Sequence, residues 1–346
     1  MESNTQVIES GNLRIMFLKK VVFEDIPDIY HSQKLPIMLP PDLLSSIEKV
    51  IRNDFCMLKT SDPLSDALAL VKLQEANDIM IVDNNGKFAG SISALSVLSK
   101  VPPQVSDVPV RYHIENPTLI RQVIDSIVDI IKIPIGDVFK PKKPTRCFYK
   151  DGYLIYTIEE LAKPYRNYGD SKNIPILNND ETIEGVVSYQ GILEYIQSDP
   201  IWLESKIEEL FTEKLRIGEL FKLLPEDTLD KACFAMDYLP IEYILICDRN
   251  NNLLGMVDRY QVSALTHPLY FHLMDIPLSE IMKPVESLYL VEVSQNVKSL
   301  IDSFLNLGIK AAIAVERLAN EIHPLRVVTP VNILQRCLQN FRSHQK

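Results

Sequence analysis

The pattern of apolar and polar positions between residues 64 and 100 predicts one compact unit. Apolar residues first recur at helical spacing, and a short apolar strand follows at 79–82. Residues 83–86, Asp-Asn-Asn-Gly, end in a pair that supplies the positive φ of a tight hairpin. A second strand, 87–93, runs directly into a helix that begins near Ala94. Units of about fifty residues are marginally stable alone, so we expect this one to pair with another copy.

The same order of strand, turn, strand and helix recurs three more times along the chain. The recurring stretches are residues 174–196, 242–265 and 310–338. Short segments also echo one another, namely IGDVF at 135–139, IGELF at 217–221 and LSEIM at 278–282. Internal repeats of this kind indicate one supersecondary unit used several times, so four copies are predicted.

The expected organisation is an α/β chain with an N-terminal arm and four repeats. Residues 1–45 do not match the unit, and we expect this arm to pack on the repeats or on a partner. The repeats are expected at 46–100, 118–198, 200–266 and 276–340. The second and third are each expected to begin with a leading helix, at 118–131 and 201–214.

These repeats resemble the CBS domain, the repeat named after cystathionine beta-synthase. The clearest match runs from Leu73-Gln74-Glu75-Ala76 to Gly90-Ser91-Ile92-Ser93, and the resemblance covers about residues 46 to 340. In that family the repeat is β-α-β-β-α, and two repeats pack into a Bateman module. The resemblance therefore implies four tandem CBS-like β-α-β-β-α repeats paired into two Bateman modules, arranged like the gamma subunit of AMP-activated protein kinase.

The resemblance also implies where a ligand would bind. CBS ligands are commonly adenosine compounds held in clefts between paired repeats. The family motif is Gly, two apolar residues, Thr or Ser, two variable residues, then Asp. The hydroxyl at the strand end bonds a ribose or phosphate oxygen, and the Asp in the first helical turn accepts both ribose hydroxyls. The helix N-terminus favours an anion nearby.

Every copy departs from this motif at the position of the acid. Copy one has Ser93 and Ser96, copy two Ser188 and Gly191, copy three Asp258 and Gln261, and copy four Thr329 and Asn332. Copy four also has Arg326 in place of the glycine. Asn332 can still make two hydrogen bonds to a ribose, without charge assistance. Asp258 would repel a phosphate placed beside it.

We expect any adenosine ligand at the strand end of copy four. It alone keeps threonine, and Arg326 and Lys310 add positive charge near the same edge. The candidate ligands are AMP, ADP and ATP, and the candidate binding residues are Thr329, Asn332, Arg326, Lys310, Ser93, Ser96, Ser188 and Asp258. The alternative interpretation is structural. Ser, Thr and Asp are good helix N-caps, and Arg326 is then a solvated or ion-paired residue.

Composition and charge exclude several function classes. The net charge of −10 argues against a general nucleic-acid binder, which needs a basic surface. No run of eighteen apolar residues exists, so no membrane span is expected. The polar, acidic start of the chain does not match a secretory signal. The five cysteines are far apart, which favours reduced thiols and a cytoplasmic location.

No enzyme motif is present, so we expect neither catalytic residues nor a metal site. GxSxG, HExxH, P-loop and GxGxxG patterns are all missing, and only 11 of 346 residues are glycine. Two functions remain. The first is a non-catalytic regulator that senses an adenosine-type nucleotide and signals to a protein partner. The second is a degenerate CBS scaffold that acts only through protein contacts. Either is expected as a homodimer or a stable complex with another protein.

Overall fold

The chain divides into two units, Met1–Met38 and Leu39–Lys346. The computed structural model describes residues 5–10, 13–18, 46–72, 78–98, 100, 117–139, 148–149, 152–163, 173–197, 205–211, 220–239, 241–265, 273–318 and 321–343. In the first unit, β1 (Thr5–Ser10) and β2 (Leu13–Leu18) form an antiparallel hairpin. The predicted arm therefore contains a hairpin, and the other residues of 1–45 lie outside the described part.

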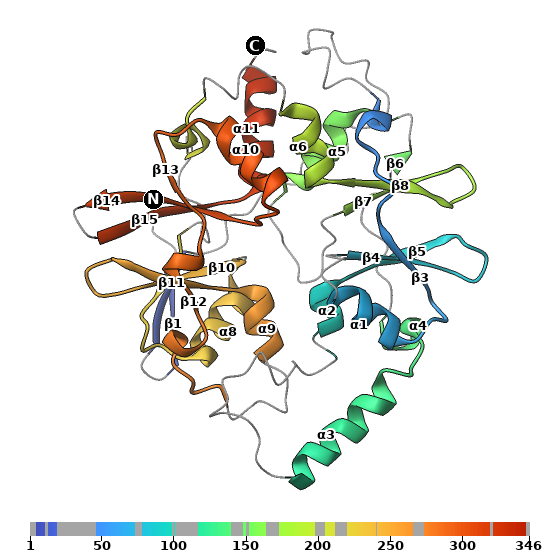
Figure 1. Cartoon of the computed structure of the whole chain (residues 1–346), viewed down its shortest axis with the longest axis horizontal. Helices are drawn as coiled ribbons and strands as arrows, with labels where there is room; N and C mark the ends of the chain where they lie inside the picture. Colours follow the sequence, from blue (N-terminus) through green and yellow to red (C-terminus); the bar gives the residue numbers. More distant parts are fainter. Residues whose placement is uncertain are drawn as a thin grey trace. The chain divides into compact units, whose positions relative to one another are not determined.

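The second unit repeats the order strand, helix, strand, strand, helix four times (Figure 1). Repeat 1 consists of β3 (Cys56–Lys59), α1 (Leu64–Lys72), β4 (Asp78–Val82), β5 (Phe88–Ser93) and α2 (Ala94–Leu98). Repeat 2 consists of β6 (Phe148–Tyr149), α5 (Leu154–Leu161), β7 (Asn173–Leu177), β8 (Ile183–Ser188) and α6 (Tyr189–Ile196).

The other two repeats follow the same order. Repeat 3 consists of β9 (Lys222–Leu223), α8 (Leu229–Tyr238), β10 (Tyr243–Cys247), β11 (Leu253–Asp258) and α9 (Arg259–Leu265). Repeat 4 consists of β13 (Leu290–Glu292), α10 (Val297–Asn306), β14 (Ala312–Leu318), β15 (Glu321–Val328) and α11 (Pro330–Ser343). The predicted α/β fold of four β-α-β-β-α repeats is confirmed.

Shorter elements lie between the repeats. They are η1 (Ile47–Val50), α3 (Pro117–Ile130), α4 (Ile135–Val138), η4 (Ile207–Phe211), η6 (Leu278–Glu280), β12 (Lys283–Pro284) and η7 (Val285–Ser287). The leading helix predicted at 118–131 matches α3. Of the helix predicted at 201–214, the described part is the 3-10 turn η4, and its two ends lie outside the described residues.

Each repeat contains a sheet in which the second strand is central. β4 pairs parallel with β3 and antiparallel with β5, and the other three repeats keep this arrangement. A parallel pair needs a crossover, which the first helix provides, whereas the antiparallel pair needs only a hairpin. Gly86, at φ +79°, supplies the positive φ expected in the first hairpin.

The hairpin of repeat 4 is long. Residues 316–318 and 321–323 continue β14 and β15 as far as the Leu318–Glu321 pair. The side chain of Asn252 in the repeat 3 hairpin accepts a hydrogen bond from the Ile322 N–H at 2.8 Å. The extension is therefore held by strand pairing and by a contact with the neighbouring repeat.

Within each pair of repeats, the two sheets pack face to face. Met80 and Phe88 of repeat 1 meet Leu177 and Val186 of repeat 2 in one buried cluster. Repeats 3 and 4 share a larger cluster of this kind. Burial of these apolar faces is the main force that holds two such sheets together, so repeats 1 and 2 form one module and repeats 3 and 4 another.

The short segment ahead of each repeat packs into the other repeat of its module. Ile47 precedes repeat 1 and lies in the core of repeat 2, while Ile135 precedes repeat 2 and lies in the core of repeat 1. Ile207 and Leu278 are exchanged in the same way between repeats 4 and 3. All four side chains are fully buried. We call the four stretches that contain η1, α4, η4 and η6 the leading segments.

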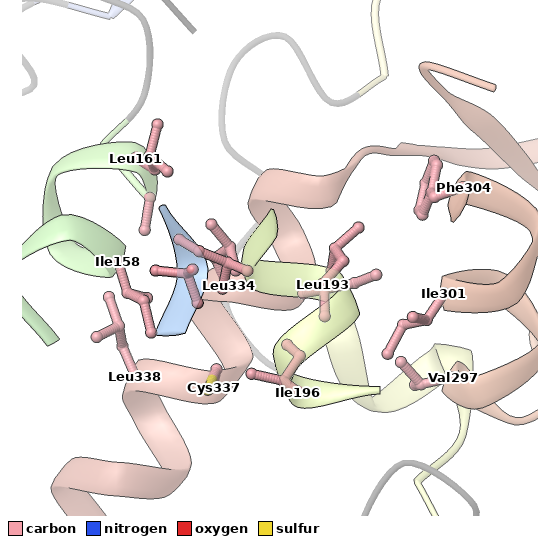
Figure 2. Close-up of a cluster of buried hydrophobic side chains, with 14 of the residues drawn as sticks. Ile158, Leu161, Leu193, Ile196, Val297, Ile301, Phe304, Leu334, Cys337 and Leu338 are labelled. Atoms are coloured by element: carbon pink, nitrogen blue, oxygen red, sulfur yellow. The ribbon is translucent and has the colours of Figure 1, made fainter. Parts of the chain in front are cut away.

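A continuous core also joins repeats 2 and 4. Figure 2 shows side chains of α5 and α6 meeting those of α10 and α11, among them Ile158, Leu161, Leu193, Ile196, Val297, Ile301, Phe304, Leu334, Cys337 and Leu338. Gln335 of α11 donates a hydrogen bond to the Ala162 carbonyl at 3.0 Å. The two modules are therefore joined through these helices. In the part of the chain that is described, no helix has both the length and the apolar character needed to cross a membrane.

Candidate ligand site

Three of the four predicted strand-end residues cap the helix that follows them. The acceptor and donor pairs are Ser93 Oγ with the Ser96 N–H (3.2 Å), Ser188 Oγ with the Gly191 N–H (3.2 Å) and Asp258 Oδ1 with the Gln261 N–H (2.7 Å). The first N–H groups of a helix have no partner within it, so a side chain that accepts from one of them stabilises the helix. The cap interpretation is confirmed at these positions. A ligand role for them stays a prediction.

In repeat 4, Thr329 and Asn332 bind each other at the start of α11. The Asn332 Oδ1 accepts hydrogen bonds from the Thr329 backbone N–H at 2.8 Å and from its hydroxyl at 3.2 Å. This is the arrangement of a capping box, in which the third helical residue reaches back to the cap. Asn332 is only 8% exposed. The amide oxygen predicted to face a ribose already has two donors within the chain, so a ligand would have to share it.

Arg326 lies on the helix-facing side of β15, against an aromatic ring. Its guanidinium carbon is 4.7 Å from the centre of the Phe211 ring, and the residue is 4% exposed. Arginine stacks readily on aromatic faces, and the interaction strengthens away from water. The interpretation of Arg326 as solvated is therefore wrong, because η4 covers it. Its predicted contact with a phosphate stays a prediction.

Repeats 2 and 3 have a glycine at the position that Arg326 occupies in repeat 4. The atoms around each glycine leave little room for a side chain. A Cβ on Gly185 would lie 2.4 Å from Ile51 Cγ2 and 2.8 Å from the Arg52 carbonyl oxygen. A Cβ on Gly255 would lie 2.5 Å from the Lys283 carbonyl oxygen. Glycine therefore lets the leading segment run directly against the last strand of the sheet.

Register makes Phe211 the counterpart of Ile51. Isolated bridges place Ser46 opposite Tyr153 in repeat 2 and Lys206 opposite Asn296 in repeat 4. Ile51 and Phe211 each follow five residues after these bridges. The Ile51–Gly185 contact of repeat 2 therefore corresponds to the Phe211–Arg326 contact of repeat 4.

Comparison with known proteins identifies the fold. Neither a protein-family model nor a curated protein matches the chain. Protein MJ1225 from Methanocaldococcus jannaschii, described as a candidate archaeal homologue of γ-AMPK, matches with a TM-score of 0.61 and 13% identity over 85% of this chain and 100% of its own. An uncharacterised conserved protein from Pyrococcus horikoshii matches with a TM-score of 0.51 and 12% identity, over 84% and 99%. The fold is that of CBS-domain proteins.

A third solved structure matches a smaller share of the chain. CBSX2 in complex with AMP has a TM-score of 0.32 and 19% identity, over 39% of this chain and 98% of its own. The resemblance seen in the sequence is confirmed for the fold, and the four units can be called CBS repeats.

In CBS repeat 3, the negative charge of Asp258 is balanced. The Lys283 ammonium lies 2.6 Å from Asp258 Oδ2 and reaches it from β12, which pairs with the last strand of repeat 3. The Asp258 side chain is 17% exposed and that of Lys283 is 51% exposed. Because an opposite charge sits in contact with it, Asp258 repels a phosphate less than the sequence indicated.

CBS repeats 1 and 2 share a polar contact that sequence reasoning missed. Asp78 and Asn173 begin the central strands of their sheets, opposite Ser93 and Ser188 respectively. The Asn173 amide donates to Asp78 Oδ2 at 3.2 Å, and Asp78 is 4% exposed. The available signal was an Asp at the head of a strand that is otherwise apolar. A buried carboxylate disfavours an anion placed beside it.

Lys310 keeps its predicted place at the edge of repeat 4. It is exposed and lies two residues before β14, at the sheet end where β15 finishes, because Ala312 pairs with Val328. The structure therefore brings Thr329 and Asn332 into contact, leaves Lys310 at the same end of the sheet, and turns Arg326 toward Phe211 instead.

Other chemistry is sparse in the described residues. No group of three or more His, Cys, Asp or Glu side chains among them is placed to hold a metal ion. Burial raises the pKa of the Cys233 thiol to about 12 and that of Cys247 to about 11. A thiol with so high a pKa stays protonated at neutral pH and is a poor nucleophile.

Proposed function

We propose that this protein is a non-catalytic regulator whose CBS repeats bind an adenosine-type nucleotide and report its presence to a protein partner. The observation that carries the proposal is the contact between Thr329 and Asn332 at the start of α11. A hydroxyl and an amide 3.2 Å apart can together serve the two hydroxyls of a ribose. The N-terminus of a 14-residue helix favours a phosphate nearby, and Lys310 adds positive charge at that edge.

The same helix offers a route for the signal. From Thr329, α11 runs into the core shared with repeat 2, where Leu334 and Leu338 are buried. A ligand that binds one arrangement of α11 better than another shifts the balance between them by its difference in affinity. A partner that contacts repeats 2 and 4 would then sense the nucleotide without touching it.

The second candidate function is a scaffold without a ligand, and one observation favours it. The strand-end groups already have partners within the chain, with Asn332 held by Thr329 and Arg326 covered by Phe211. In that case the strand ends stabilise helices only, and the protein works entirely through protein contacts.

Isothermal titration with AMP, ADP and ATP tests the proposal. We expect the wild type to bind at least one of them. Asn332→Ala should weaken that binding about fivefold, the loss of one neutral hydrogen bond worth about 1 kcal/mol. Asn332→Asp should bind at least as tightly as wild type, because a carboxylate strengthens the ribose contacts.

The matched control is Asn296→Ala. Asn296 caps α10 of the same repeat through its side-chain oxygen and the Ser299 N–H at 2.9 Å, away from the strand end. This variant loses a cap of the same chemistry and should keep the wild-type affinity. If Asn332→Ala also keeps it, the site lies elsewhere. If the wild type binds none of the three nucleotides, the scaffold function is the correct one.

A further inference from the structure

Helix α8 of repeat 3 has an outer face that carries two carboxylates and two aromatic rings. Asp230 and Asp237 are exposed, and Tyr238 is 65% exposed. The rings of Phe234 and Tyr238 lie against each other, with their centres 4.3 Å apart. At 3.6 residues per turn, these four residues fall within about 100° of the helix circumference, so they form one surface. We call it the α8 face.

The two carboxylates of the α8 face act on the same neighbourhood. Burial, together with the charges of Asp237 and Asp230, raises the pKa of the Cys233 thiol to about 12. Both acids therefore lie within electrostatic reach of one side chain. Lys231 belongs to the same helix, but it pairs with Asp227 at 2.6 Å. The α8 face itself consists of two acids and two rings.

The neighbouring helix α9 brings a cation to the end of α8. Arg259 donates hydrogen bonds to the carbonyl groups of Ile241 at 2.7 Å and Leu239 at 3.2 Å, and to that of Met236. The last carbonyl groups of a helix have no partner within it, so this guanidinium caps the C-terminus of α8. Its charge acts first on those carbonyl groups.

The equivalent face of α5 in repeat 2 is covered by another helix. Both helices begin at a fully buried leucine, so Ile155 and Ala162 of α5 correspond to the two acids of the α8 face. Ile155 and Ala162 are buried in the core shared with repeat 4, and Gln335 of α11 donates to the Ala162 carbonyl at 3.0 Å. Carboxylates at these places would be costly to bury without cationic partners. The α8 face therefore has the position of a helix-binding surface, with acids where repeat 2 is apolar.

We propose that the α8 face binds an amphipathic helix of a partner protein that presents two basic residues about two turns apart. Asp230 and Asp237 are seven residues apart, or about 10 Å along the helix axis. Arginine fits this surface best, because a guanidinium pairs with a carboxylate and also stacks on aromatic rings such as those of Phe234 and Tyr238. The bound helix would lie on α8 as α11 lies on α5. The proposal does not depend on a bound nucleotide, so it applies to the scaffold function as well.

Fluorescence anisotropy on the full chain tests the charge of the partner. The probe is a labelled synthetic helix of about four turns, with a leucine stripe and two arginines seven residues apart. The contact is smaller than the roughly 1,600 Å² of a standard interface, so we expect a dissociation constant in the micromolar range. Added salt should weaken the binding, because exposed charge pairs are screened. A second probe, with glutamate in place of both arginines, should bind at least tenfold more weakly. Equal binding of the two probes, or no binding of the first at about 1 mM, overturns the proposal.

Charge reversal locates the contact on the protein. Asp230→Lys should weaken binding of the arginine probe at least tenfold, because it places like charges opposite one another. Asp230→Asn keeps an oxygen for the Thr228 hydroxyl and should weaken the binding in the same direction. The matched control is Glu48→Lys in η1, which makes the same change in net charge at another exposed acid and should bind as the wild type does. If Asp230→Lys and Glu48→Lys bind equally well, the probe does not bind the α8 face.

The aromatic part of the face has a matched control of its own. Tyr238→Ala should weaken binding about fivefold, through the loss of one stacking interaction with an exposed cation. Tyr153 of repeat 2 is also exposed, at 50%, and also lies against a second ring, that of Tyr156. Tyr153→Ala should therefore keep the wild-type affinity. Urea denaturation checks that both variants fold, as expected for surface substitutions. An unchanged affinity in Tyr238→Ala would rule out the rings as part of the contact.

Discussion

Repeats 2 and 4 differ at one equivalent contact. In repeat 2, Gly185 has no side chain, and Ile51 of the leading segment lies directly against the strand backbone. In repeat 4, the same place holds Arg326, and Phe211 stacks over its guanidinium. The first contact depends on the absence of atoms, whereas the second depends on a large charged group that stays covered. The same exchange of leading segments is thus compatible with two kinds of packing.

This difference shows where each repeat tolerates change. The repeat 2 contact includes the Arg52 carbonyl oxygen, and backbone atoms cannot move aside without displacing the whole segment. The repeat 4 contact joins two side chains, each with rotamers of its own. We therefore expect substitutions at this contact to be tolerated less well in repeat 2 than in repeat 4.

The largest expected effect comes from Gly185→Ala. The new Cβ would lie 2.4 Å from Ile51 Cγ2 and 2.8 Å from a carbonyl oxygen, so the leading segment has to shift. We expect the free energy of unfolding to fall by about 3 kcal/mol, the upper range for overpacking, as measured by urea denaturation. Adding Ile51→Ala should recover part of the loss, because it removes one of the two clashing atoms. Wild-type stability of Gly185→Ala would show that the contact is looser than described.

An intermediate effect is expected from Phe211→Ala in repeat 4. The substitution removes the ring that covers Arg326, and we expect a loss of about 2 kcal/mol in the same assay. The control is Arg326→Met, which keeps an unbranched side chain of similar length but removes the charge. Methionine keeps an apolar stem against the ring, so this variant should lose less than Phe211→Ala does, about 1 kcal/mol. If Arg326→Met is the more damaging of the two, the charge and not the ring stabilises this contact.

The smallest effect concerns the ion pairs beside Gly185. Arg52 binds Asp54 at 2.6 Å and Glu194 at 2.9 Å. The hydrogen bond from Arg52 lowers the pKa of Asp54. A lowered pKa in the folded state gives stability that is present above the unfolded pKa of about 3.9 and is lost as the pH falls through the folded value. Because the Asp54 side chain is 64% exposed, we expect only about 0.5 kcal/mol.

Urea denaturation of Asp54→Asn beside wild type measures this pair. The two proteins should differ at pH 7 and converge once the pH lies below the lowered pKa of Asp54 in the folded state, where the carboxyl is protonated in both states. A difference that persists unchanged at low pH would mean that Asp54 stabilises through its shape and not through its charge.

The sequence predicted individual helices, strands and turns better than the contacts between them. Turn residues such as Gly86 mark hairpins by local chemistry, and caps such as Ser188 mark helix starts, so both could be placed without the fold. The exchange of leading segments could not be predicted, because periodicity describes a segment's own faces and not the core that it enters. In the second module, the structural counterpart of 135–139 is 278–282, as the sequence echo indicated, whereas the counterpart of 47–51 is 207–211 and had no such echo.

For the same reason, the sequence predicted only those contacts of the candidate site that join residues close together in the chain. Thr329 and Asn332 are three residues apart, so their contact follows from helix geometry. Phe211 and Arg326 are far apart in the chain and have no shared pattern, so their stacking required the fold. The same holds for Asp78 and Asn173, which meet only because two repeats pair.

The shared core of repeats 2 and 4 also determines when the chain can finish folding during synthesis. The apolar faces of α5 and α6 are made near the middle of the chain, but the helix that covers them, α11, is the last described element to leave the ribosome. Repeat 1 similarly lacks Ile135 until its own residues have all been made. Chaperones bind exposed apolar surface on a partly folded chain, and the same surface promotes aggregation. The nascent chain therefore carries this risk until α11 has emerged.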